Sequence, residues 1–132
     1  MLNTHVRDIM TKKPTTVGPN DTLADVNKVM NQKRLQQLPV TENGKLVGLI
    51  TTFDLWKDNH NPGENDMRKV SEVMTKKVVK LAPKDKVGTA AELFVDRRFK
   101  TLPVVNLENE LKGVVTAFDV IEHVHKKEYP ND

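Results

Sequence analysis

Two threonine–aspartate pairs combine residue types and a spacing that could bind a ligand. Thr51 and Asp54 lie in a Gly-x-x-Thr-x-x-Asp segment, and Thr116 and Asp119 repeat that segment later in the chain. A threonine hydroxyl and the open N–H groups at a helix N-terminus suit an anion such as phosphate. A nearby carboxylate can accept hydrogen bonds from the two hydroxyls of a cis-diol such as ribose. The same residues are also common helix caps, so the pattern by itself leaves both interpretations open.

The chain consists of two copies of one sequence unit. The segment 48–54 returns almost unchanged as 113–119, and Met10 with its neighbours returns around Met74. Such a tandem repeat predicts a pseudo-twofold axis and two related sites. The repeats and the polar linker between them are expected at 1–59, 60–69 and 70–132, the linker being marked by proline and glycine.

Hydrophobic periodicity predicts the element order β-α-β-β-α in the first repeat. A short extended segment at 15–17 precedes a helix that Asp21 is expected to cap. The apolar stripe of this helix consists of Leu23, Val26, Val29 and Met30. A strand, a hairpin turn, a second strand and a second helix follow at 38–40, 42–44, 46–50 and about 53–56.

The second repeat predicts the same order. A strand at 78–81 precedes a helix with Asp85 as its expected cap, and the stripe of that helix consists of Val87, Ala90, Ala91, Leu93 and Phe94. Two strands at 102–105 and 111–116 lead into the closing helix, whose apolar residues are Val120, Ile121 and Val124. The predicted fold class is therefore α/β, with two β-α-β-β-α repeats.

Composition narrows the classes of function. The 132 residues include no cysteine, which excludes disulfides, thiolate metal sites and cysteine nucleophiles. His123 and His125 would point to different faces of a helix, and no P-loop or catalytic-triad pattern is present. We therefore expect no enzyme activity, no catalytic residues, no metal and no cofactor. A net charge of +3 is too mild to indicate nucleic acid, and suits a small anionic ligand better.

Other sequence features bear on location and on anions. No apolar run approaches the roughly 20 residues that cross a bilayer, and residues 1–5 lack the features of a secretory signal. We therefore expect a cytoplasmic protein without a membrane partner. The lysine pairs at 12–13 and 76–77 could approach a phosphate, although lysines are more often simply solvated.

The motifs, taken in order, resemble a known family. Each copy opens with Val-x-x-x-Met-Thr, continues with Pro-x-Asp and Leu-Pro-Val, and closes with Gly-x-x-Thr-x-Phe-Asp. This series, present twice between Val6 and about Lys126, resembles a pair of cystathionine-β-synthase (CBS) domains, or Bateman module. The resemblance implies a regulatory sensor of adenosyl ligands such as AMP, ADP, ATP or S-adenosylmethionine. It also implies two facing three-stranded sheets, with clefts between the repeats.

The resemblance further implies which residues line the two clefts. Each cleft would combine the first strand and Leu-Pro-Val region of one repeat with the Thr and Asp of the other. The first set is Thr15, Thr16, Val17, Leu38, Pro39, Val40, Thr116 and Asp119. The second set is Val79, Lys80, Leu81, Leu102, Pro103, Val104, Thr51 and Asp54. Aspartate would hold the ribose hydroxyls, and Lys100 beside the second set would favour a more highly phosphorylated ligand.

The same resemblance implies a homodimer that forms through helices. The expected contact residues are Leu55, Trp56, Val120, Ile121 and Val124. A regulated protein of unknown identity is the other expected partner. The alternative is a dimerising scaffold whose clefts hold no nucleotide and whose repeated aspartates act only as caps.

Overall fold

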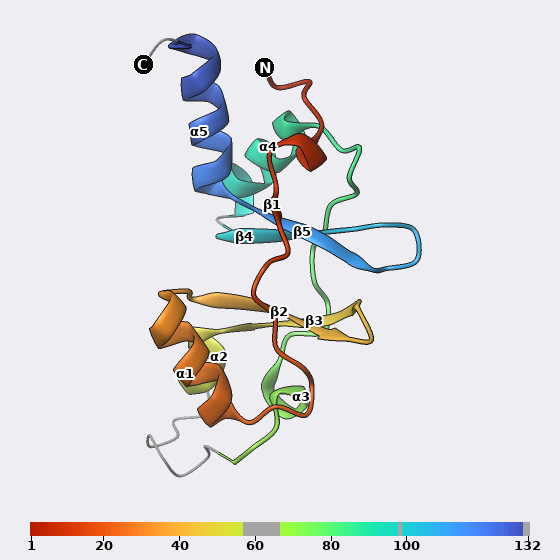
Figure 1. Cartoon of the computed structure of the whole chain (residues 1–132), viewed down its shortest axis with the longest axis vertical. Helices are drawn as coiled ribbons and strands as arrows, with labels where there is room; N and C mark the ends of the chain where they lie inside the picture. Colours follow the sequence, from red (N-terminus) through yellow and green to blue (C-terminus); the bar gives the residue numbers. More distant parts are fainter. Residues whose placement is uncertain (57–66, 98, 131–132) are drawn as a thin grey trace. The chain divides into compact units, whose positions relative to one another are not determined.

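After the opening segment of each half, the elements follow the predicted order helix, strand, strand, helix in both halves of the chain (Figure 1). A computed structural model describes residues 1–56, 67–97 and 99–130. Its elements are a 3-10 helix Val6–Asp8, β1 Thr11–Lys12, α1 Leu23–Lys33, β2 Gln37–Glu42, β3 Lys45–Thr51, α2 Thr52–Trp56, α3 Val70–Val73, α4 Val87–Arg97, β4 Thr101–Val105, β5 Leu111–Thr116 and α5 Ala117–Glu128. Most of the predicted linker at 60–69 lies outside the described residues. The predicted α/β class is confirmed.

The chain folds into two compact units, and each unit takes segments from both repeats. Unit 1 contains residues 1–14 and 79–132, and unit 2 contains residues 15–78. In unit 1, β1 pairs with β5 in an antiparallel sheet of order β1-β5-β4. In unit 2, Leu49 and Thr75 exchange two backbone hydrogen bonds of 2.9 Å at the edge of the β2-β3 hairpin. The opening segment of each repeat therefore pairs with the other repeat's hairpin, as a third strand in unit 1 and as a single bridge in unit 2. Among the described residues, one of the two expected sheets is thus three-stranded and the other two-stranded.

The turn of the first hairpin lies within the predicted segment 42–44. β2 ends at Glu42 and β3 begins at Lys45, so the loop contains only Asn43 and Gly44. Both loop residues have positive φ, 54° and 81°, as a type I′ turn demands. The predicted hairpin at 38–50 is confirmed.

The helix caps differ from the prediction. α1 is capped by Thr22, whose hydroxyl accepts from Asp25 N–H while the Asp25 carboxylate accepts from Thr22 N–H. Asp21, the predicted cap, instead accepts the Gly18 N–H at 2.7 Å. Asp85 accepts the Ala82 N–H at 2.8 Å in the same way. Both aspartates close the turn before their helix, because their carboxylates reach back three residues rather than forward.

The predicted strand at 78–81 shrinks to a single bridge between Leu81 and Val104. Leu81 N–H donates to the Pro103 carbonyl, and Val105 N–H donates to the Leu81 carbonyl, both at 2.8 Å. Pro103 has no N–H with which to extend this parallel ladder toward Val79. Pro39 limits the segment 15–17 to the bridge between Val17 and Val40 for the same reason.

Each unit has its own hydrophobic core beneath its hairpin. In unit 2, the predicted stripe residues Leu23, Val26 and Met30 are buried against Leu38 and Val40. The unit 1 core consists of Val6, Leu81, Val87, Ala90, Leu102, Val104, Val115 and Val120. Val6, from the exchanged opening segment, is fully buried, so the exchange is part of the core packing.

Candidate functional site

Both threonine–aspartate pairs form the reciprocal hydrogen bonds of a helix cap. Thr116 N–H donates to Asp119 Oδ2 at 2.8 Å, and Asp119 N–H donates to Thr116 Oγ1 at 3.1 Å. Thr51 and Asp54 make the same two bonds, at 2.9 and 3.2 Å, and the Thr51 hydroxyl adds a third at 3.1 Å. The capping role is therefore present at both pairs, and it uses one carboxylate oxygen, Oδ2.

The two aspartates differ in their surroundings. Asp54 is buried, with 4% of its surface exposed, and it makes a further interaction beyond the cap. Asp119 is half-buried at the start of the twelve-residue helix α5. Its second oxygen, Oδ1, has no hydrogen-bond partner among the described residues. Asp119 can thus cap α5 and still accept a hydrogen bond from a ligand hydroxyl.

The Leu-Pro-Val segments place their residues on two faces of a strand. Leu38 and Val40 are fully buried in the unit 2 core, and Leu102 and Val104 are buried likewise in unit 1. Because side chains alternate along a strand, the intervening prolines lie on the opposite face of each hairpin. The core leucines and valines can therefore meet a ligand only through their backbone atoms.

Three more residues of the first predicted set, together with Gln37 beside that set, belong to unit 2. Thr15 is half-buried and Thr16 is exposed, while Val17 is buried and bonded through its backbone to Pro39 and Thr41. Gln37, just before Leu38, has a buried side-chain oxygen without a hydrogen-bond partner among the described residues. A buried acceptor without a partner is unfavourable, so this amide can gain stability from a donor on a ligand or a water.

The glycine of each motif is required by packing. A Cβ added to Gly113 would lie 2.7 Å from both Met10 Sδ and the Thr11 carbonyl oxygen. A Cβ on Gly48 would lie 2.7 Å from Met74 Sδ and 3.0 Å from the Thr75 carbonyl oxygen. The close backbone approach that a strand glycine indicates is therefore real, and the approaching backbone is the exchanged opening segment.

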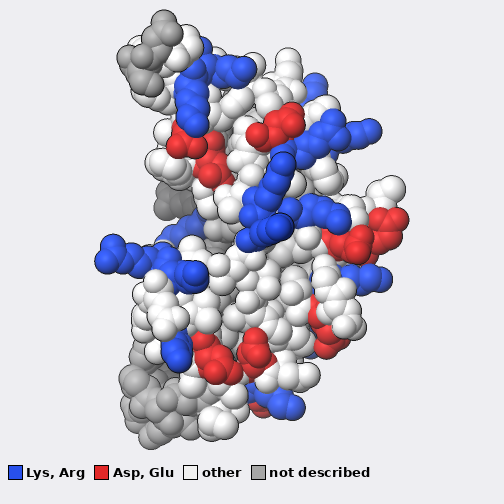
Figure 2. Space-filling model, in the orientation of Figure 1, with Lys and Arg blue, Asp and Glu red and all other residues white. Residues whose placement is uncertain are grey.

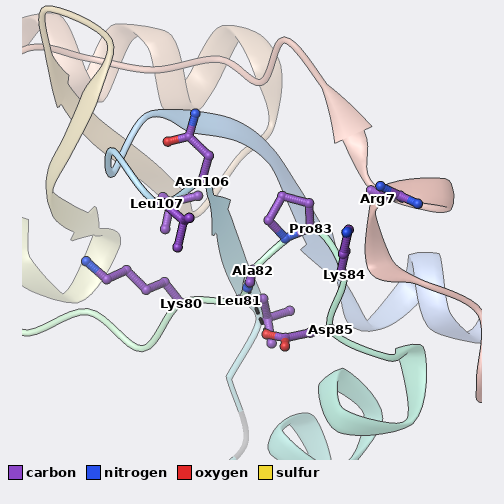
Figure 3. A pocket seen from close by; sticks show the side chains of 10 residues that line it. Arg7, Lys80, Leu81, Ala82, Pro83, Lys84, Asp85, Asn106 and Leu107 are labelled. Atoms are coloured by element: carbon purple, nitrogen blue, oxygen red, sulfur yellow. Dashed lines mark hydrogen bonds between the residues drawn. The ribbon is translucent and has the colours of Figure 1, made fainter.

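A pocket of about 700 Å³ opens in unit 1 between the β4-β5 hairpin and the segment before α4 (Figure 3). Its lining residues are Arg7, Lys80, Leu81, Ala82, Pro83, Lys84, Asp85, Val105, Asn106 and Leu107. Lys80 and Leu81 belong to the second predicted set, whereas Val79 and Lys100 are exposed outside the pocket lining. The sequence motifs did not indicate Arg7 or Lys84, because neither residue is shared between the repeats.

The expected dimer residues fall into three groups. Val120 is buried in the unit 1 core, and Leu55 packs against the unit 2 core, so these two residues stabilise the units themselves. Ile121 is 64% exposed, and so is its neighbour Phe118 at 66%. Val124 is half-buried, and the Trp56 side chain lies outside the described residues.

Within the described part of the chain, no group of acidic or histidine side chains is arranged to hold a metal ion. Over the same residues, no helix combines the length and apolar character needed to cross a membrane.

Comparison with known proteins identifies the family that the sequence motifs indicated. The family model described as "CBS domain" matches residues 6–55 and 70–126. The CBS domain-containing protein YhcV of Bacillus subtilis is 32% identical over 87% of this chain and 81% of its own length. Protein MJ0188 of Methanocaldococcus jannaschii is 34% identical over 98% of this chain, which spans 47% of that relative.

A solved structure extends the comparison to ligands. The CBS domain pair of protein MJ0100, in complex with 5′-methylthioadenosine and S-adenosyl-L-methionine, is 28% identical to this chain with a TM-score of 0.78. The alignment covers 94% of this chain and 98% of that one.

Proposed function

The chain belongs to the CBS domain family, and we propose that it is a regulatory module that binds an adenosyl ligand and catalyses no reaction. The observation that carries this proposal is the MJ0100 domain pair, which aligns with nearly this whole chain and holds two ligands. Both ligands contain an adenosine group, so the shared chemistry is a purine and a ribose. The proposed ligands here are AMP, ADP, ATP or S-adenosylmethionine.

The chain retains polar groups that suit a ribose. Asp119 has an acceptor oxygen beyond those used in its cap, and Thr116 holds that carboxylate in position. The Gln37 side-chain oxygen adds a buried acceptor beside the first predicted set. The crosswise assignment of the two sets stays a prediction, as does the preference that Lys100 would give for additional phosphates.

The proposed module acts by changing conformation or assembly rather than by chemistry. A ligand that binds one arrangement of the repeats more tightly shifts the population toward that arrangement. The proposed assembly is a cytoplasmic homodimer that reports the ligand to a regulated protein. The alternative, a scaffold with no nucleotide, predicts that no adenosyl ligand raises the melting temperature.

The test compares AMP with 2′-deoxy-AMP by calorimetry on the wild-type chain and on Asp119→Asn. Asparagine can still accept the Thr116 N–H, so the cap survives while the charge is lost. Loss of a hydrogen bond to a charged group costs about 1.5–3 kcal/mol, or roughly tenfold or more in affinity. We expect wild type to prefer AMP by this factor, and Asp119→Asn to lose the preference.

Asp25→Asn is the matched control. Asp25 holds the same capping position in α1, but it belongs to neither predicted set. Its substitution should leave AMP affinity unchanged. Equal affinities of wild type for the two nucleotides would contradict the role assigned to Asp119. The absence of binding by every adenosyl ligand would favour the scaffold.

A further inference from the structure

We propose that unit 1 carries a second ligand site, for the oligophosphate group of a small molecule. The site consists of the pocket in Figure 3 and an adjoining hollow of about 420 Å³. The hollow is lined by Arg7, Asp8, Met10, Lys12, Lys13, Pro83 and Lys112. The pocket and the hollow share Arg7 and Pro83, so they adjoin, and together they are called the basic depression.

The lining of this depression is strongly basic. Its cations are Arg7, Lys12, Lys13, Lys80, Lys84 and Lys112, against the two carboxylates of Asp8 and Asp85. Figure 2 shows lysine and arginine side chains gathered on this unit. A group of cations around a concave surface attracts an anion more strongly than the same charges spread out.

Several of these cations have no acidic partner. No carboxylate among the described residues forms an ion pair with Arg7, Lys12 or Lys84. Asp85 uses Oδ2 to accept the Ala82 N–H, which orders the loop beneath Pro83. Lys80 Nζ donates to Asn109 Oδ1 at 2.9 Å, and this hydrogen bond fixes the position of the Lys80 side chain. Lys112 does pair with Glu110, with 4.0 Å between Nζ and Oε1, so the cations that stay available to an anion include Arg7, Lys12 and Lys84.

Unit 2 provides an internal comparison, because it repeats the backbone but keeps only the lysine pair 76–77 of the six basic positions. Arg7 N–H donates to the Pro83 carbonyl at 3.1 Å, and the corresponding bond in unit 2 runs from Ser71 to Pro19 at 3.0 Å. Four of the basic positions become uncharged in unit 2: Arg7, Lys80, Lys84 and Lys112 correspond to Ser71, Thr16, Asn20 and Val47. Because the same backbone hydrogen bond forms with either set of side chains, the fold does not require the four extra cations.

The lining favours an oligophosphate over a nucleic acid. Single-stranded nucleic acids bind through aromatic side chains on which bases stack. Neither the pocket nor the hollow has an aromatic residue in its lining. The hollow supplies cations for several phosphates, while Leu81, Pro83 and Val105 give the pocket an apolar wall for an organic group. Lys80 and Leu81 also belong to the second predicted adenosyl set, so the test must separate the two sites.

The probe is inorganic tripolyphosphate, titrated into the full chain by calorimetry at about 50 mM salt, where screening is modest. The test variant is Arg7→Ser/Lys84→Asn, which gives unit 1 the residues that unit 2 carries on the same backbone. The control variant, Lys28→Gln/Lys33→Gln, removes the same charge from the exposed face of α1. We expect one tripolyphosphate to bind, the test variant to bind at least tenfold more weakly, and the control to change by less than about twofold.

Tripolyphosphate contains no ribose, so its binding does not depend on the function proposed above. The test variant should bind AMP as wild type does, and the Asp119→Asn variant should bind tripolyphosphate as wild type does. Any of four results would overturn the proposal. These are no tripolyphosphate binding, an equal loss in the control variant, displacement of AMP by tripolyphosphate, or tighter binding of a single-stranded oligonucleotide than of tripolyphosphate.

Discussion

Gly113→Ala tests whether the exchanged opening segment stabilises unit 1. In β5, Gly113 pairs with Lys12 of β1 on one side and with Val104 of β4 on the other. An alanine methyl there would lie 2.7 Å from the Thr11 carbonyl oxygen, inside van der Waals contact. The Met10 thioether can rotate away, but the carbonyl belongs to the β1 backbone. The methyl group therefore fits only if β1 moves away from β5.

The expected cost follows from that geometry. Overpacking a well-packed site by one carbon costs about 1–3 kcal/mol. Gly48→Ala should cost less, because its nearest backbone atom, the Thr75 carbonyl oxygen, lies 3.0 Å from the added Cβ. The measurement is the free energy of unfolding from urea titration, followed by circular dichroism.

Gly18→Ala is the matched control. Its added Cβ would have no neighbour closer than 3.7 Å, and Gly18 does not have positive φ. We expect it to change the free energy of unfolding by no more than about 0.5–1 kcal/mol in either direction, because alanine also restricts the unfolded chain. If Gly113→Ala were as stable as wild type, or if both substitutions cost the same, the close approach of β1 would not explain this glycine.

Two further predictions concern acid stability and assembly. The backbone N–H and then the hydroxyl of Thr22 hold the pKa of Asp25 below its usual 3.8, so this carboxylate stabilises the folded state above that pH and loses the effect as pH falls through the lowered pKa. Urea midpoints of wild type and Asp25→Asn should therefore differ at neutral pH and converge in acid, and a constant difference would contradict the capping explanation. Phe118 and Ile121 lie exposed on one face of α5, so the chain should be a dimer at micromolar concentration and Ile121→Glu a monomer. Light scattering that gives a wild-type mass near 15.0 kDa would refute the dimer.

Local sequence determined the elements whose stabilising contacts lie close along the chain. The spacing of Leu23, Val26 and Met30 predicted the buried face of α1, because a helix returns to the same face every three or four residues. The Asn43-Gly44 turn predicted its hairpin, since few residues tolerate positive φ twice in succession. The repeated Thr-x-x-Asp predicted both capping and ligand chemistry, and the capping bonds are confirmed.

Periodicity could not predict which segments pair across the chain. β1 contains only two residues, and its partner Gly113 comes from the other repeat. Hydrophobic pattern likewise gave Val120 and Ile121 the same role, although one is buried and the other exposed. Burial depends on which surface a helix meets, and that surface is made by residues distant in sequence.

The basic depression in unit 1 was decided by the tertiary structure for the same reason. Arg7 meets Pro83 and Lys84 only because the opening segment crosses to the other hairpin. A comparison of the two repeats in sequence shows that Arg7 replaces a serine and Lys84 an asparagine, but not that these positions are neighbours. The sequence gives the charge of each residue. The distances that bring these charges together into a binding site are set only by the tertiary structure.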